Sequence, residues 1–339
     1  MRIRHILIAA TIALCVAGCA RPKPVVQLRY VSERAERMAF GVRVRHTLMA
    51  GRFDRLDALA DSLQRDDVRF DNGMSRLSSY YFFGMRSVDH EKDPTEWEHH
   101  LDRLREWQDS RPESRHATVA LATALIGRGW LARGGGYAPT VTDKGWHGFG
   151  GDLMEARQLL LQCSDRAKAT PSWYGAMLDV MHGLSADRAV YDSIYAEAIA
   201  RFPNYDGFHV SRSWYLQPRW YGAPGEWESE AALCAPGQPD SLRDDLYAHI
   251  VLFQSRYSMD IFKESPTLDW ERTRRGLEVW ERRCPNSPEP TSALAMLASQ
   301  TGHYDVARPA FAKLGNMVDV DVWLDPSIFV EQRRLTQTD

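Results

Sequence analysis

The spacing of apolar residues is the feature that most constrains the fold of this chain. From about Val31 onward they recur every three or four positions, and no segment alternates convincingly between apolar and polar residues. This spacing places side chains on one face of an α-helix, whereas a half-buried strand needs alternation. The clearest example is segment 187–202, where Pro203 follows the apolar stripe and ends the helix. The sequence therefore predicts an all-α fold.

The turns between the expected helices follow a repeated form. Gly51–Asp54 and Gly302–Asp305 both have the order Gly-x-aromatic-Asp, after one expected helix and before the next. Pro171 and Pro203 lie 32 residues apart, close to the repeat of about 34 residues in tetratricopeptide arrays. The chain thus resembles degenerate tetratricopeptide-like repeats, with the regular period lost between Pro203 and Pro285. This resemblance implies an irregular helical-hairpin array, an α-solenoid.

The N-terminal segment has the pattern of a secretory signal. Arg2 and Arg4 precede an apolar run, Ile6–Val16, which is too short to cross a bilayer because a spanning helix needs about 20 apolar residues. The four residues 16–19, Val-Ala-Gly-Cys, resemble the bacterial lipobox. That resemblance implies cleavage before Cys19 and attachment of lipid to its thiol.

These patterns predict four parts of the chain. They are a lipoprotein signal peptide at 1–18, the lipidated cysteine and a tether at 19–30, a single helical-repeat domain at 31–330, and a tail at 331–339. Ala20 stands where lipoproteins kept at the inner membrane typically have Asp. The resemblance therefore implies a protein of the bacterial cell envelope, anchored by lipid to the outer membrane and facing the periplasm.

Two longer blocks resemble the signatures of an uncharacterised bacterial family, a domain of unknown function. The first block runs over 129–141 and is followed by Gly145 and Trp146. The second block runs over 215–227, and the expected helix 56–63 resembles the start of the family. The resemblance implies a helical-repeat domain of secreted or envelope proteins that has no assigned activity.

The charge balance argues against one class of partner. The chain has 42 Lys and Arg against 45 Asp and Glu, which gives a net charge of -3. Proteins that bind nucleic acid without reading its sequence need a basic surface, and this composition does not supply one. We therefore expect no nucleic-acid partner.

The sequence has no motif that indicates catalysis. His90-Glu91 and His99-His100 lack the two histidines four positions apart that a zinc-protease helix needs. Gly134–Gly136 follows an expected helix, whereas a nucleotide-binding loop follows a strand. Segment 209–213 holds a histidine and two serines but no Gly-x-Ser-x-Gly turn and no evident orienting acid. We expect no catalytic residue, no metal and no cofactor, and the sequence favours a protein that is not an enzyme.

Aromatic and charged residues gather in the two family-like blocks. Rings stack on sugar faces and carboxylates bind hydroxyls or cleave the bond, so a glycan site uses both. The same rings also fill gaps between irregular helices, which is the interpretation that the sequence favours. We expect segments 130–146 and 214–227 to contact each other, with Arg133 or Arg219 hydrogen-bonded there, because irregular loops must satisfy their polar groups. The residues of this candidate ligand or partner surface are Trp130, Arg133, Tyr137, Trp146, Arg219, Trp220, Tyr221, Glu226 and Trp227.

Two functions from different classes remain open. The first is an envelope lipoprotein whose helical array holds a protein or a peptide, which needs no catalytic group. The second is a cell-wall glycan binder or hydrolase that uses blocks 130–146 and 214–228 and takes murein as its ligand. Clustering of the rings around an open cleft would favour the second function, and their burial would favour the first.

The cysteines predict one disulfide bridge. Beside Cys19, the predicted mature chain keeps Cys163, Cys234 and Cys284. Cys163 lies on an apolar stripe, where a free thiol packs like a small hydrophobic side chain. Cys234 and Cys284 lie at expected helix ends, and an oxidising periplasm permits a bridge between them.

Overall fold

The computed structural model describes residues 27–337, and helices make up 69% of the structure. The chain is therefore mostly helical, as the apolar spacing predicts, with the addition of two strands of three residues each. Cys19 and the predicted signal peptide lie outside the described residues. Within residues 27–337, no helix combines the length and the apolar character that crossing a membrane requires.

The helices are mostly short, and the longest, α6, has 20 residues. In chain order the elements are β1 (Arg29–Val31), α1 (Glu33–Met49), α2 (Phe53–Arg65), α3 (Arg76–Phe82), α4 (Pro94–Ser110), α5 (Arg115–Arg133), the 3₁₀ turn η1 (Ala138–Thr140), α6 (Asp143–Gln162), α7 (Ser164–Ala167), α8 (Pro171–Gly183), α9 (Arg188–Arg201), α10 (Gly207–Tyr215), α11 (Glu226–Leu233), α12 (Asp240–Ser255), α13 (Ile261–Glu264), α14 (Trp270–Arg283), α15 (Glu289–Gln300), α16 (Tyr304–Leu314), β2 (Met317–Asp319), α17 (Val320–Trp323) and α18 (Pro326–Leu335).

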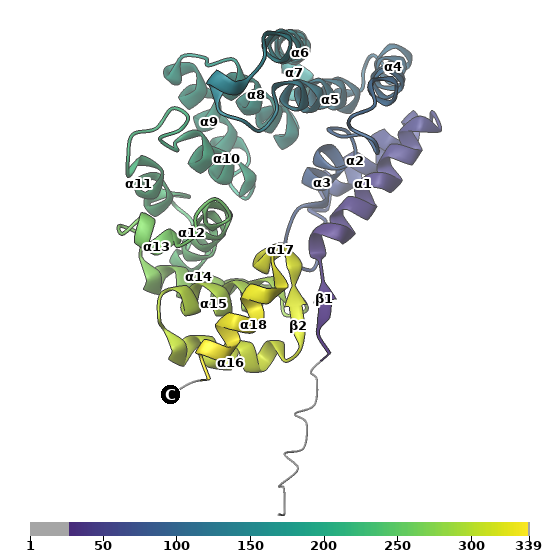
Figure 1. Ribbon diagram of the computed structural model, residues 1–339. Coiled ribbons are helices and arrows are strands. Elements are labelled where there is room, and N and C mark those ends of the chain that lie inside the picture. The colour runs from purple at the N-terminus through teal and green to yellow at the C-terminus, as the bar shows by residue number, and fades with distance from the viewer. Residues whose placement is uncertain (1–26, 338–339) are drawn as a thin grey trace, which may run out of the picture.

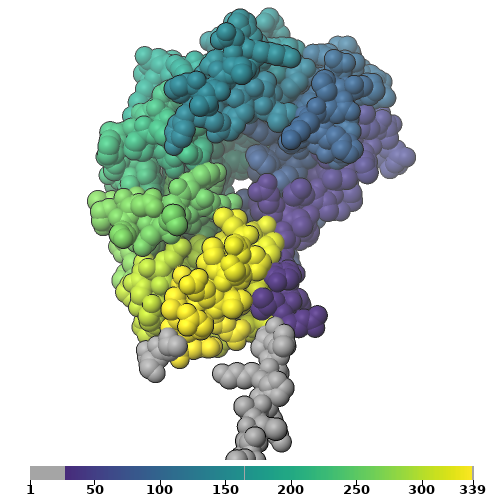
Figure 2. Space-filling view, viewed as in Figure 1, coloured from purple at the N-terminus to yellow at the C-terminus, as the bar shows by residue number. Residues whose placement is uncertain are grey.

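Successive helices follow one another around a ring (Figure 1). The most extensive packing joins near neighbours in the chain, as in α5 with α6, α12 with α14, and α15 with α16. The last helices return to the start of the described chain, where β2 lies beside β1 (Figure 1). Figure 2 shows a small opening near the middle of this face, between the N-terminal, central and C-terminal parts of the ring.

Side chains at the helix starts fix where several of the helices begin. Ser114 caps α5 by accepting the N–H of Ala117, and Asp269 caps α14 by accepting the N–H of Arg272. Such caps satisfy N–H groups that have no partner within the helix. Gly51 and Gly302 have positive φ angles of 66° and 77°. The two Gly-x-aromatic-Asp segments are thus the tight turns before α2 and α16, as their form predicts.

The hydrophobic core is continuous around the ring, and among the described helices α5 has the longest unbroken buried stretch. Residues 116–126 of α5 are all buried, and α4, α6 and α8 pack around this helix. Small residues alternate with Val, Leu and Ile along the buried stretch, which allows neighbouring helices to approach closely. The C-terminal end of α5 is thereby held in a fixed position, and it carries Trp130 and Arg133.

The structure changes the expected limits of the domain at both ends. Arg29 and Tyr30, which the sequence analysis places in the tether, belong to β1. Residues 331–335, which it places in the tail, belong to α18. Strand β1 pairs with β2 at the other end of the described chain, and α18 packs on α15 and α17, contacts that a local pattern does not reveal.

The predicted bridge between Cys234 and Cys284 is wrong, because all three cysteines among the described residues are free thiols. Cys234 follows α11, where its carbonyl accepts a hydrogen bond from Arg243 on α12. The sulfur of Cys284 instead faces Gly73, where an added Cβ would lie 3.1 Å from it. The two thiols are buried among different neighbours. A place at a helix end shortly before a proline therefore does not bring Cys234 and Cys284 together.

The close contact between α12 and α14 requires a glycine, which gives a stability prediction. A Cβ on Gly276 would overlap the carbonyl of Asp244 and lie 2.7 Å from the Cβ of Ala248. We expect Gly276→Ala to lower the free energy of unfolding by about 1 to 3 kcal/mol through overpacking. The matched control is Gly175→Ala in α8, where a Cβ meets nothing within 4 Å. That change should stabilise the helix by about 0.5 to 1 kcal/mol. Denaturant unfolding of both variants tests this, and equal stabilities would contradict it.

Candidate functional site

The two aromatic blocks meet, as the sequence predicts, around the ring of His182 at the end of α8. Trp130 comes from the last turn of α5, and Trp220 comes from the loop after α10. Their ring centroids lie 6.0 Å apart, and the centroid of His182 lies 5.6 Å from Trp130 and 4.6 Å from Trp220. The pairs are edge-to-face, an arrangement that aromatic rings favour. We call these three rings, with Arg133 and Trp146, the aromatic cluster.

Arg133 fills the centre of the aromatic cluster. Its guanidinium carbon lies 5.6 Å, 5.4 Å and 5.4 Å from the ring centroids of Trp130, Trp146 and Trp220. Its Nη1 donates hydrogen bonds to the carbonyls of Gly134 and Gly136, at 3.1 and 3.0 Å. Gly134 has a φ of +74°, so the chain turns back and presents these carbonyls to the side chain. The rings therefore surround a cation that the protein itself supplies.

Hydrogen bonds fasten the cluster to α8. The indole Nε1 of Trp130 donates to Asp179 at 2.9 Å, and Arg86 donates to the other oxygen of the same carboxylate at 2.5 Å. The hydroxyl of Tyr221 donates to the backbone carbonyl of His182 at 2.7 Å. These bonds fix the orientation of the rings, so the cluster is rigid where it meets the helix.

His182 is a poor proton-transfer group in this environment. It is buried, and its burial lowers its pKa to about 4, with the nearby charge of Arg133 acting in the same direction against that of Asp179. Its imidazole is therefore neutral at neutral pH. Among the described residues, its Nε2 and the Nε1 of Trp220 are buried without a hydrogen-bond partner.

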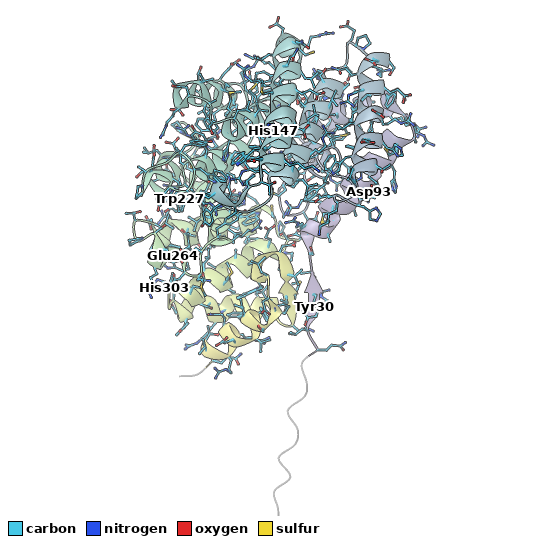
Figure 3. All side chains as sticks on the ribbon, turned by 45° about the horizontal axis from the view of Figure 1, so that its top comes forward. Tyr30, Asp93, His147, Trp227, Glu264 and His303 are labelled. Atoms are coloured by element: carbon cyan, nitrogen blue, oxygen red, sulfur yellow. The ribbon has the colours of Figure 1, made fainter. Side chains whose placement is uncertain are left out.

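Several of the predicted site residues lie outside the cluster, and its member Trp146 lies at its exposed edge. Tyr137 is 74% exposed and Trp146 is 39% exposed. Arg219 stacks on Trp214, with 4.1 Å between its guanidinium carbon and the ring centroid. Trp227, which Figure 3 labels, is buried on α11. The structure thus brings Trp130, Arg133, Trp146, Trp220 and Tyr221 together and leaves Tyr137, Arg219, Glu226 and Trp227 outside that group.

Glu226 does not have the environment of a glycosidase acid. It forms an ion pair with Arg188 and accepts the backbone N–H of Ala223 at 2.8 Å. The hydrogen bond from Arg188 is the main cause that lowers the pKa of Glu226. A general acid needs a raised pKa and a free proton to give, so this carboxylate is unsuited to that role.

A groove that no sequence pattern predicts borders the same end of α5 through Leu131. It has a volume of about 550 Å³ and runs between α1 and segment 83–92. Its lining combines apolar residues with polar and charged ones. The apolar residues are Met38, Val42, Phe83, Val88 and Leu131, and the polar ones are Arg45, Ser87, Asp89, His90, Glu91 and Lys92. Asp93, labelled in Figure 3, follows this segment and caps α4.

Arg45 fastens the outer wall of the groove to α1. Its side chain is buried, and Nη1 donates to the carbonyls of Phe83 and Ser87 at 2.8 and 3.0 Å. Its Nη2 donates to Asp89 at 2.5 Å. The backbone of Phe83 comes so close to α1 that a Cβ on Gly41 would overlap it. A glycine inside a helix opposite a Phe-Phe pair was the available sequence signal for this close approach.

The groove and the aromatic cluster share one connection. Arg86 belongs to segment 83–92, which borders the groove, and binds Asp179, which also accepts the indole N–H of Trp130. A Cβ on Gly127 of α5 would overlap the backbone of Arg86, so the two segments are in direct contact. Within residues 27–337, no three His, Cys, Asp or Glu side chains gather in a way that could hold a metal ion.

The aromatic cluster gives a second stability prediction. Trp220→Ala removes contacts with Trp130, His182 and Arg133, so we expect it to lower the free energy of unfolding by about 3 kcal/mol. The exposed Tyr137 is the control, and Tyr137→Ala should change stability by less than about 0.5 kcal/mol. Thermal unfolding compares the two variants. Loss of murein-fragment binding in Trp220→Ala at unchanged melting temperature would instead make the cluster a glycan site.

One family model matches part of the chain. Residues 42–173 match the model described as Domain of unknown function (DUF4034). The match includes the first family-like block and the helix at 56–63, and it ends before the second block, 215–227. The comparisons with curated proteins and with solved structures gave no match. The matched segment contains most of the groove lining and Trp130, Arg133 and Trp146, whereas His182 and Trp220 lie beyond it.

Proposed function

We propose that the protein is a binding scaffold that holds a peptide segment of a partner protein in the groove between α1 and segment 83–92. The groove is the observation that carries this proposal. Its volume of about 550 Å³ is within the usual range of sites that enclose a small ligand or a few side chains. A scaffold of this kind needs no catalytic group.

The groove wall offers apolar surface to a partner. Met38 is 48% exposed and Leu131 is 40% exposed, and they lie on the two helices that border the groove. Covering such side chains with an apolar residue of a peptide gains roughly 25 cal/mol for each Å² removed from water. The charged lining residues, including Glu91 and Lys92, would add hydrogen bonds that fix the direction of the peptide.

The helical arrangement is consistent with a degenerate tetratricopeptide-like array. The turns at Gly51 and Gly302 each join two successive helices, and α15 packs closely on α16. Arrays of this type expose extended surfaces along their helices and commonly bind peptides or proteins. The match to a domain of unknown function leaves the partner open.

We also propose that the scaffold is anchored in the bacterial envelope through Cys19. The support is the charged start, the short apolar run and the Val-Ala-Gly-Cys order at residues 16–19. Several acyl chains on one cysteine give stable membrane attachment, since each buried CH₂ contributes about 0.8 kcal/mol. The proposed location is the outer membrane, with the scaffold facing the periplasm.

A glycan partner is the second candidate, and the exposure of Tyr137 and Trp146 favours it. Both rings lie in the block next to Arg133 and are open to solvent. They could stack on murein sugars, although the ion pair of Glu226 argues against hydrolysis. Tyr137→Ala and Trp146→Ala would then weaken binding of murein fragments, while changes in the groove would not.

Peptide selection tests the groove. Random peptides displayed on phage are selected on the full chain, and the affinity of the enriched peptides is then measured on variants. We expect Met38→Asp and Leu131→Asp to weaken binding about tenfold or more, because a carboxylate would be desolvated against the apolar wall. Met154→Asp is the matched control, since Met154 is 66% exposed on α6 outside the groove. Enriched peptides that bind all three variants equally would refute the proposal.

Membrane fractionation tests the anchor. Cys19→Ser removes the thiol that takes the lipid, so we expect the variant to appear in the soluble fraction after a high-salt wash, while the unaltered protein stays with the membrane. Cys163→Ser is the control for loss of a cysteine as such. Continued sedimentation of Cys19→Ser with the membrane would show that another part of the chain holds it there.

A further inference from the structure

The two ends of the described chain are joined by a small parallel sheet. Tyr30 in β1 pairs with Val318 in β2, and the register extends from Arg29 opposite Met317 to Val31 opposite Asp319. Figure 1 shows that these strands close the ring of helices. With only three residues in each strand, the sheet supplies few hydrogen bonds, so the closure depends on the side chains around it.

Carboxylates make the contacts on both sides of the closure. Asp321 accepts the hydroxyl of Ser32 at 3.0 Å and the backbone N–H of Arg34 at 2.8 Å. Glu33, in the first turn of α1, accepts the hydroxyl of Ser287 at 2.6 Å. Hydrogen bonds from neutral donors hold these acids in place, and none of the bonds supplies a compensating positive charge.

Two further acids are buried next to Glu33. Asp319 is 0% exposed, and its Oδ1 accepts the N–H of Asp321 at 2.9 Å. Within the described chain, its Oδ2 is buried without a hydrogen-bond partner. Glu289 is 6% exposed and accepts the amide of Asn72 at 2.7 Å. The negative charges of Glu33, Glu289 and Asp319 repel one another where the ring closes.

The positive charges at the closure are few and poorly placed. Arg256, at the end of α12, reaches only to 3.8 Å from Glu289. Arg37 attracts Glu33, Glu289 and Asp321, but its Nε is buried without a hydrogen-bond partner in the described structure. The other titratable groups that face these acids are the Cys284 thiol near Glu33 and the buried His249 near Glu289. Neither group places a positive charge next to Asp319.

We propose that the closure between β1 and β2 is a proton-controlled latch, which is firm when Glu33 and Asp319 are protonated and loosens when they ionise. A protonated Asp319 removes the buried charge on the oxygen that has no donor. Ionisation restores that charge beside Glu289 and Asp321 and makes opening favourable, because opening returns the carboxylates to water.

The direction of the effect follows from burial. Burial raises the pKa of Glu33 from 4.5 to about 7 against the hydrogen bond from Ser287. The charges of Glu289 and Asp319 add to the increase, and that of Arg37 opposes it. Burial, with the charge of Glu289, raises the pKa of Asp319 from 3.8 to about 7, against the backbone hydrogen bonds from Asp321 and Val322. An acid whose pKa is higher in the closed state destabilises that state increasingly as the pH rises from the open-state value to the closed-state value. The closure is therefore firm near pH 4 and weakest above about pH 7.

Hydrogen exchange on the full chain tests the latch. Amide protection at residues 29–31 and 317–319 is measured from about pH 5 to about pH 9 and corrected for the intrinsic exchange rate, with residues 116–126 of α5 as the internal reference. We expect protection of the two strands to fall about tenfold or more over this range while that of α5 stays constant. Strand protection that does not change with pH in the unaltered protein would overturn the proposal by itself.

Substitutions then assign the effect to the two acids. Glu33→Gln combined with Asp319→Asn mimics the protonated side chains, and Asn still serves as an N-cap for α17. We expect this variant to keep the acidic level of protection at every pH. Glu36→Gln, an exposed change in the same turn of α1, should behave like the unaltered protein. A pH dependence that survives in the double variant would refute the assignment.

A reversible crosslink gives an independent test. Arg29 and Met317 are partners in the sheet, and Arg29 Nη2 lies 3.1 Å from the sulfur of Met317. Arg29→Cys with Met317→Cys should allow a disulfide that holds the latch closed. We expect the oxidised variant to lose the pH dependence of strand protection and to regain it with reductant. A pH dependence of equal size in the oxidised form would contradict the latch.

Discussion

The pairing of the two ends of the described chain is the interaction on which the ring depends. In an open helical array each hairpin contacts only its neighbours, and the two ends stay apart. Here Ser32 and Asp321, which lie 289 positions apart in the sequence, share a hydrogen bond. The entropy cost of closing a loop grows only slowly with its length, so a small number of contacts can hold even this one. The buried carboxylates place an electrostatic cost on those contacts.

Most of the features that were predictable from the sequence depend on residues close together in the chain. The stripe at 187–202 became α9 with caps at both ends of that segment, and the two Gly-x-aromatic-Asp segments became turns with positive φ. The contact between the aromatic blocks was also predictable, because two irregular segments with many polar groups need partners. Arg133 supplied the hydrogen bonds to backbone carbonyls that this argument required.

The features that the sequence did not predict depend on contacts between residues that lie far apart in the chain. A strand of three residues has no readable alternation, and β1 exists only because β2 lies beside it. The groove arises because Gly41 lets the backbone of Phe83 approach α1, and periodicity does not show which segment will arrive there. The disulfide prediction failed for the same reason, since helix ends near proline give no information on which thiols face each other.

Helix α1 connects the closure of the ring to the groove. Its first turn contains Glu33 and its second contains Met38, and Arg37 lies between them with its guanidinium carbon 5.9 Å from the Phe83 ring centroid. The backbone hydrogen bonds of α1 are internal to the helix, so its first and second turns form one continuous segment. Glu33, Met38 and the close contact of Gly41 with Phe83 thus lie on one helix. If the proposed peptide binds the closed ring more tightly than the open one, it raises the affinity of Glu33 for its proton, and protonation of Glu33 then raises the affinity for the peptide by the same factor.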